Sequence, residues 1–228
     1  GNGVYQVLFI QGLDRTTAGN TALLLATVPV WAALLSALFR EGALDRWVMG
    51  GIGATLLGMV LVVTGGQGGV ALGGATLSGD ILAAGAAFLW ALYTVGSRSF
   101  LLRYGSVAVT AWTLWAGSAA LVLMGVPDLL RVEWRAIPLV AGWGAVLFAG
   151  VMALGLSYIF WYRGVHRLGS ARTSAYSNLV PVVALLTAWP LLGEVPALLQ
   201  WAGAAVILLG VLLARVGGRP RKALVPAP

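Results

Sequence analysis

The chain alternates between long apolar runs and short polar breaks along nearly its whole length. Most runs approach the roughly 20 residues that an α-helix needs to cross the hydrocarbon core of a bilayer. Backbone groups in lipid must be paired within the segment, so the runs predict helices. Eight spans are expected, at residues 1–13, 17–39, 46–64, 78–99, 105–126, 138–162, 169–190 and 196–215. The predicted fold is an all-α, polytopic transmembrane helix bundle.

Composition agrees with a membrane protein and excludes much chemistry. Hydrophobic residues make up 60% of the 228 residues and charged residues 9%, against roughly 45–50% and 25% in soluble domains. There is no Cys, which excludes disulfides and thiolate metal sites. The one His, His166, is expected in a loop, and no carboxylate lies in the middle of an apolar run. We therefore expect no catalytic residue, no metal site and no cofactor.

The basic residues are distributed unevenly over the two expected sides of the bundle. Eleven of the fourteen Lys and Arg residues fall on one side: Arg40, Arg46, Arg98, Arg103, Arg163, Arg167, Arg172, Arg215, Arg219, Arg221 and Lys222. The other three are Arg15, Arg131 and Arg135. The positive-inside rule then places the C-terminus in the cytoplasm. Because the charges sit at the ends of apolar runs, the net charge of +7 does not indicate nucleic-acid binding.

The chain contains an internal repeat. Gly12, Pro29, Gly51 and Gly58 recur 152 positions later as Gly164, Pro181, Gly203 and Gly210. Five helices separate equivalent positions, and this odd number predicts that the second copy is inverted relative to the first. Inverted repeats of membrane helices place a substrate site at their interface and support alternating access.

The repeat predicts the organisation of the chain. Residues 1–64 form the end of a first repeat (spans three to five of ten), 65–77 a Gly-rich connector, 78–216 a second repeat (spans six to ten) and 217–228 a cytoplasmic tail. The first copy is incomplete, so about 75 residues are expected before Gly1. A phosphate-binding loop is the alternative for the connector, but no strand precedes it and no Gly-Lys-Ser/Thr follows.

Polar and aromatic residues on one helix face are candidates for a substrate-binding interior. Trp90, Tyr93 and Thr94 follow helical spacing in the span 78–99, and Ser97 extends this face by one turn. Ser174, Ser177 and Asn178 do so in the span 169–190. The repeat relates a further pair, Ser157 and Tyr158, to Tyr5 and Gln6. Pro29 and Pro181 are expected to kink their helices, because proline cannot donate a backbone hydrogen bond.

Each candidate has an alternative structural interpretation. Small hydroxyl residues allow helices to approach closely, and Trp or Tyr near a helix end anchors it at the interface. Trp112 and Trp115 are expected to face lipid or pack between helices. Asp80 is interpreted as a helix cap. Glu194, and its near counterpart Glu41, are interpreted as stabilising helix ends, with catalysis or a proton relay as the alternative.

Two long segments resemble the EamA-type permeases of the drug/metabolite transporter superfamily. They are NTALLLATVPVWAALLSALFREGAL and TSAYSNLVPVVALLTAWPLLGEVP, each followed by a glycine-containing helix, and SGDILAAGAAFLWALYTVGSR resembles the family's second-repeat opening. The first copy departs from the usual Gly-Glu by reading Arg40-Glu41-Gly42. The resemblance implies a ten-helix bundle of two inverted halves with both termini in the cytoplasm. It also implies export or exchange of small metabolites such as amino acids or organic cations.

The function expected from these patterns is that of a permease, an exporter in a bacterial cytoplasmic membrane. Its expected partners are a small-molecule substrate and the lipid bilayer, and no nucleic acid; a homodimer is left open. A non-transporting membrane scaffold is the first alternative. An intramembrane enzyme is the second, but it would need paired aspartates, a Ser–His pair or an HExxH helix, and the chain has none of them.

Overall fold

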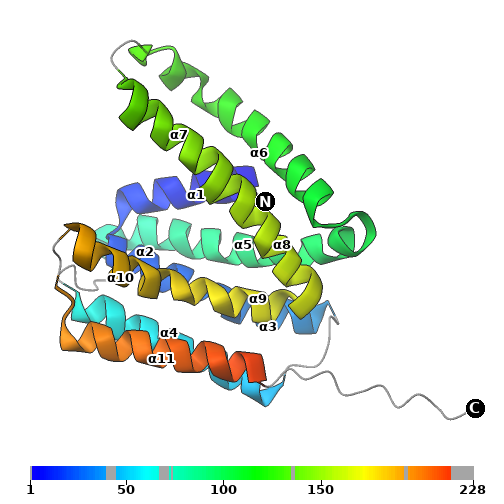
Figure 1. The fold of residues 1–228 in the computed structure, drawn as a ribbon, viewed down its shortest axis with the longest axis vertical. Coiled ribbons are helices and arrows are strands. Elements are labelled where there is room, and N and C mark those ends of the chain that lie inside the picture. The colour runs from blue at the N-terminus through cyan, green and yellow to red at the C-terminus, as the bar shows by residue number, and fades with distance from the viewer. Residues whose placement is uncertain are drawn as a thin grey trace, which may run out of the picture.

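The computed structural model describes residues 2–39, 45–66, 72, 74–134, 137–192 and 195–216, and every regular element in these ranges is a helix (Figure 1). The expected all-α bundle is confirmed. Within these described ranges, seven helical runs are long and apolar enough to cross a membrane, and α1 is shorter. The main helices are α1 (Asn2–Arg15), α2 (Ala18–Leu25), α3 (Val28–Leu38), α4 (Arg46–Gly65), α5 (Leu77–Tyr104), α6 (Ser106–Leu129), α7 (Gly144–Phe148), α8 (Ser157–Leu168), α9 (Ser170–Ala175), α10 (Val180–Leu192) and α11 (Leu198–Val216).

One expected span contains two π-helical segments. Leu139–Trp143 precedes α7, and Ala149–Leu156 joins α7 to α8, so that 139–168 is one continuous helical run. His166 lies in the last turn of α8 and not in a loop. Expectation and structure differ because the polar residues of this turn mark the end of the apolar run, whereas the helical backbone continues past them.

Two helical runs are interrupted at equivalent places. The first run breaks between α2 and α3, and the second breaks at the 3-10 segment Tyr176–Leu179 between α9 and α10. Pro29 and Pro181 are the second residues of α3 and α10, where the missing N–H costs least. At each break a hydroxyl donates to the carbonyl three residues earlier: Thr27 to Leu24 and Ser177 to Ser174, both at 2.6 Å.

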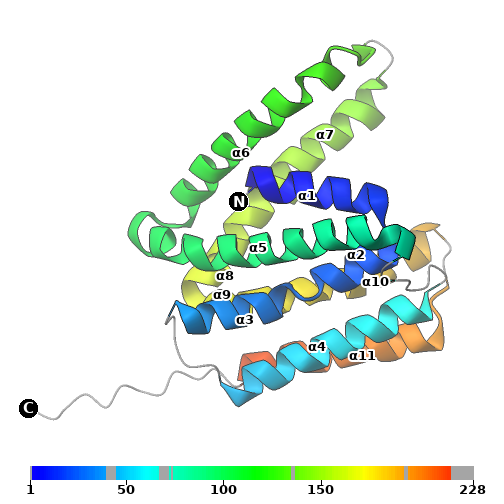
Figure 2. The same ribbon diagram turned by 180° about the vertical axis from the view of Figure 1, so that it is seen from behind.

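The equivalent helices α4 and α11 run antiparallel, as the predicted inversion of the repeats requires. A Cβ atom added at Gly51 would lie 2.5 Å from the Gly210 carbonyl oxygen, and one at Gly58 would lie 2.7 Å from that of Gly203. Residue numbers increase along α4 in the direction in which they decrease along α11, so these equivalent helices run antiparallel. They lie side by side in two views (Figures 1 and 2). Glycine permits this close backbone approach.

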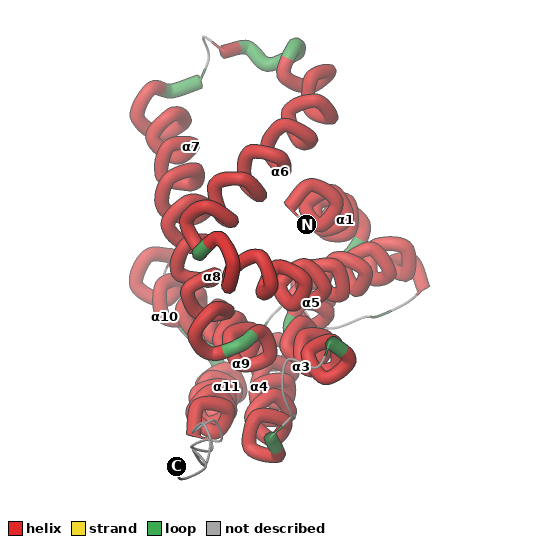
Figure 3. Tube along the Cα trace, turned by 90° about the vertical axis from the view of Figure 1, so that its right-hand side faces the viewer, coloured by secondary structure: helices red, strands yellow, loops and turns green. Residues whose placement is uncertain are grey.

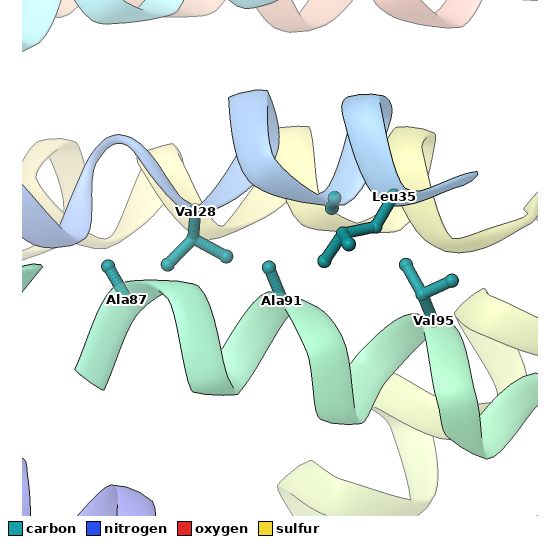
Figure 4. Packing of buried hydrophobic residues seen from close by; sticks show 6 residues of the cluster. Val28, Leu35, Ala87, Ala91 and Val95 are labelled. Atoms are coloured by element: carbon teal, nitrogen blue, oxygen red, sulfur yellow. The ribbon is translucent and has the colours of Figure 1, made fainter. Parts of the chain in front are cut away.

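Small residues also bring α3 and α5 together. Val28 and Leu35 of α3 pack against Ala87, Ala91 and Val95 of α5, and all five side chains are buried (Figure 4). This contact joins a helix of the first repeat to the first helix of the second repeat. Dispersion between closely packed helices replaces the hydrophobic effect as the source of association in lipid.

The helices α6 and α7 diverge from the rest of the bundle, and α1 lies near the angle between α5 and α6 (Figure 3). Most of the large apolar side chains on α6 and α7 are exposed. Trp112 is 77% exposed and Trp115 78%, so neither packs between helices.

Candidate substrate site

An aromatic cluster lies where α1, α5 and α8 meet. We define the Trp90 cluster as Tyr5, Trp90, Tyr93, Tyr158 and Trp161. The Trp90 ring centroid lies 5.0 Å from that of Tyr5, 5.7 Å from Tyr158, 5.8 Å from Trp161 and 5.9 Å from Tyr93. These separations are typical of tilted and edge-to-face aromatic pairs. Trp90 is thus the centre of a surface built by both repeats.

The Trp90 cluster continues into a chain of hydroxyl groups. The Tyr93 hydroxyl is in direct hydrogen-bond contact with that of Tyr162, which also forms a side-chain hydrogen bond with Thr113. Tyr162 is fully buried. Neither Tyr162 nor Thr113 was among the residues predicted from the sequence, although Tyr162 follows Tyr158 by four residues and therefore shares its helix face.

Two cavities adjoin this hydroxyl chain. One, of about 500 Å³, lies between α5 from Tyr93 to Tyr104 and α6 from Ala108 to Thr113. The other, of about 420 Å³, is bounded by the start of α1 and by α6 from Thr113 to Met124, again with Tyr93. Both have the size and the largely apolar lining of small-molecule sites.

The three candidate binding residues of the span 169–190 differ in what their side chains contact. The Asn178 side-chain amide donates to Thr55 Oγ1 of α4 at 2.9 Å, and both residues are buried, so this amide joins two helices. Ser177 uses its hydroxyl on the backbone of its own helix. Ser174 is fully buried and its hydroxyl has no partner among the described residues. An unpaired buried hydroxyl can bind a water or a ligand atom.

The remaining candidate binding residues also differ in burial and in hydrogen bonding. Thr94 is fully buried, and its hydroxyl has no partner in the described part of the chain. Gln6 is half-buried on α1, next to Tyr5 in sequence. Ser157 is exposed, and its hydroxyl donates to the Met152 carbonyl at 3.0 Å. The structure thus brings Tyr5, Trp90, Tyr93 and Tyr158 into one cluster and directs Ser157 away from it. Glu41 and Glu194 lie outside the described residues.

A buried polar network surrounds Asp80, whose position in the sequence had indicated a helix cap. The cap position of α5 is Thr76, and Asp80 lies one turn further on. Its carboxylate accepts hydrogen bonds from Thr16, Asn20 and Thr76, those from Asn20 and Thr76 at 3.0 Å. Asp80 therefore ties the α1–α2 junction of the first repeat to α5 of the second.

Replacing Asp80 with alanine is expected to lower the stability of the protein by about 1–3 kcal/mol, because it removes the acceptor that the side chains of Thr16, Asn20 and Thr76 share. The midpoint of thermal unfolding in detergent measures the change. Asp14→Ala is the matched control, since Asp14 is exposed. Equal midpoints for the two variants would show that the network contributes nothing to stability.

The chemistry available to the site is that of binding. Among the described residues, no group of three or more His, Cys, Asp and Glu side chains could hold a metal ion. The Trp90 cluster offers ring faces, tyrosine hydroxyls and the buried indole N–H of Trp161, which has no partner in the residues described. Such a surface can stack on planar groups, contact cations and donate single hydrogen bonds.

An antiparallel pair of equivalent helices, seven membrane-length helical runs and an interior aromatic surface define the class of multi-pass membrane transporters. The EamA-like transporter family matches residues 1–64 and 77–216. The chain belongs to this family. It is accordingly a transporter and not an enzyme.

Several curated relatives cover most of the chain. A protein of Streptantibioticus cattleyicolor named probable terminal-alkyne amino-acid exporter is 32% identical over 229 residues, 99% of this chain and 74% of that protein. The uncharacterized transporter YyaM of Bacillus subtilis is 29% identical over 92% of this chain and 68% of its own length. A probable amino-acid metabolite efflux pump of Salmonella typhimurium is 26% identical, and the match covers 96% of this chain and 75% of that protein.

A solved crystal structure shares the fold. Its TM-score is 0.75 at 21% sequence identity, and the match covers 93% of this chain and 72% of the other. At this identity the likeness supports the helical arrangement alone.

Proposed function

We propose that this protein exports small organic molecules, such as amino acids or organic cations, by alternating access. The observation that carries the proposal is the Trp90 cluster, because it combines α1 of the first repeat with α5 and α8 of the second. A substrate bound there touches both halves. Rocking of one half against the other would then expose it to each side of the membrane in turn.

The chemistry of the cluster favours a substrate held by ring contacts and neutral hydrogen bonds. Its five side chains include no carboxylate and no basic group. An ammonium group would be attracted to the faces of Trp90 and the tyrosines. The names of the Streptantibioticus and Salmonella relatives, an exporter and an efflux pump for amino-acid compounds, support the same class and direction.

The proposed location is a bacterial cytoplasmic membrane with the C-terminus in the cytoplasm. Arg46 begins α4, and Arg103, Arg167 and Arg215 lie in the last turns of α5, α8 and α11. In the alternating topology these positions share one side, as the positive-inside rule requires of a cytoplasmic face.

The test is flux through liposomes that contain the full-length gene product. Labelled amino acids and labelled organic cations are loaded, and their release is followed over time and concentration. Saturable release above that of protein-free liposomes is expected for at least one of the two classes. Folded protein that releases neither class and co-purifies tightly with another membrane protein would favour the scaffold alternative.

A further inference from the structure

Two residues are common to both cavities beside the Trp90 cluster. Tyr93 of α5 and Thr113 of α6 line the 500 Å³ cavity and the 420 Å³ cavity alike. The larger cavity extends from them toward the turn at Gly105, and the smaller extends along α6 toward Met124. The two spaces therefore lie in opposite directions along the helices, with Tyr93 and Thr113 between them.

The Tyr93 side chain is held in this place by a rigid neighbour. Its hydroxyl contacts the hydroxyl of Tyr162, which is fully buried among Leu101, Val109 and Val165. The Tyr162 hydroxyl also forms a hydrogen bond with the Thr113 side chain. Tyr93 itself is only half-buried. Close packing fixes Tyr162, whereas Tyr93 lines both cavities and has room to change rotamer.

We propose that Tyr93 closes a substrate path between the two cavities and that Tyr162 is the positioning residue that keeps it closed. The path runs along α5 and α6 past the Trp90 cluster, so the inference rests on the proposed transport function. Tyr93 contacts both Trp90 and Tyr162. A ligand that displaces the Tyr93 ring would break its bond to Tyr162 and join the cavities. Ligand binding and opening are thereby coupled through one side chain.

The absence of Cys from the chain permits a direct test. Gly96→Cys places a thiol in the larger cavity, where an added Cβ meets nothing within 4 Å. Ala120→Cys places one in the smaller cavity. Each full-length variant is treated with a membrane-impermeant maleimide in vesicles of both orientations. We expect each thiol to react fast from one face only, and the two thiols to react from opposite faces.

Removing the bond between the hydroxyls should weaken this asymmetry. In a Tyr93→Phe background, labelling from the slow face is expected to rise about fivefold, the effect of one lost hydrogen bond on a two-state equilibrium. Tyr162→Phe should give at least this rise, because it also removes the bond to Thr113. The double variant should match Tyr162→Phe, because both changes remove the bond between the two hydroxyls. Tyr93→Ala should abolish the asymmetry. Tyr176→Phe, on the segment between α9 and α10, is the control and should leave it unchanged.

Equal labelling from both faces before any tyrosine is changed would overturn the proposal. So would an asymmetry that Tyr93→Ala and Tyr162→Phe leave intact in protein that elutes as a folded species. The flux assay separates this outcome from failure of the proposed function. Asymmetric labelling without flux would support the Tyr93 barrier and contradict the proposed transport function. Flux without asymmetric labelling would support transport and contradict the barrier.

Discussion

Gly58→Leu is expected to destabilise the protein severely, because it forces two closely packed helices apart. A Cβ atom at position 58 would lie 2.7 Å from the Gly203 carbonyl oxygen and 2.7 Å from the backbone nitrogen of Ile207. Neither backbone can yield while α4 and α11 stay in contact, so the leucine separates them. We expect a loss of more than about 3 kcal/mol, the upper end of the usual cost of overpacking. The yield of folded protein and the thermal midpoint in detergent measure it.

Gly53→Leu is the matched control on the same helix. Gly53 is exposed, and an added Cβ there meets nothing within 4 Å. Leucine is also a better helix former than glycine by roughly 0.5–1 kcal/mol. This variant should be as stable as the parent or slightly more so. A Gly58→Leu protein with an unchanged midpoint would show that α4 and α11 do not cross at these glycines.

Trp90→Ala is expected to weaken substrate binding by about fivefold to a hundredfold. Trp90 contacts every other member of the cluster, so its removal deletes one stacking surface and loosens the rings that remain. Loss of two aromatic contacts with a ligand corresponds to about 1–3 kcal/mol, and each 1.4 kcal/mol is a factor of about ten in affinity. The concentration dependence of flux per folded molecule measures the change.

Two variants distinguish binding from structural support. Trp90→Phe keeps a ring face and should show an intermediate loss. Trp115→Ala removes a tryptophan that is 78% exposed and should leave flux unchanged. If Trp90→Ala lowered the thermal midpoint while the folded fraction transported with unchanged affinity, Trp90 would have only a packing role.

The apolar runs predicted the helices well because membrane length is a local property of sequence. Expectation and structure differ mainly at polar ends: α5 continues to Tyr104 and α8 to Leu168, beyond the expected residues 99 and 162. Long Arg side chains in these turns can extend to the interface while their backbone stays helical. The antiparallel α4–α11 crossing was predictable as well, since it follows from the odd number of helices in the repeat.

The site was harder to predict because partners across helices depend on packing angles that no single helix specifies. Helical spacing placed Trp90 and Tyr93 on one face, and the repeat related Tyr158 to Gln6, next to Tyr5. The same polarity also selected Asn178, whose amide the structure directs to Thr55 of α4. Asp80 looked like a local cap, yet it joins both repeats. Contacts between residues far apart in the sequence decide which polar residues line the site and which join helices. The spacing of residues along one helix does not specify these contacts.

The inverted arrangement of the two repeats is the claim on which the site and the mechanism depend, and a cross-link tests it directly. A Cβ atom at Gly65 would lie 3.0 Å from the Leu199 Cβ, so the double variant Gly65→Cys, Leu199→Cys should form a disulfide under mild oxidation. Gly65→Cys with Arg215→Cys should not, because the end of α11 lies near Gly51 at the other end of α4. Mass spectrometry of the linked peptides reports both. A cross-link in the second pair and none in the first would mean that α4 and α11 run parallel, and would contradict the account.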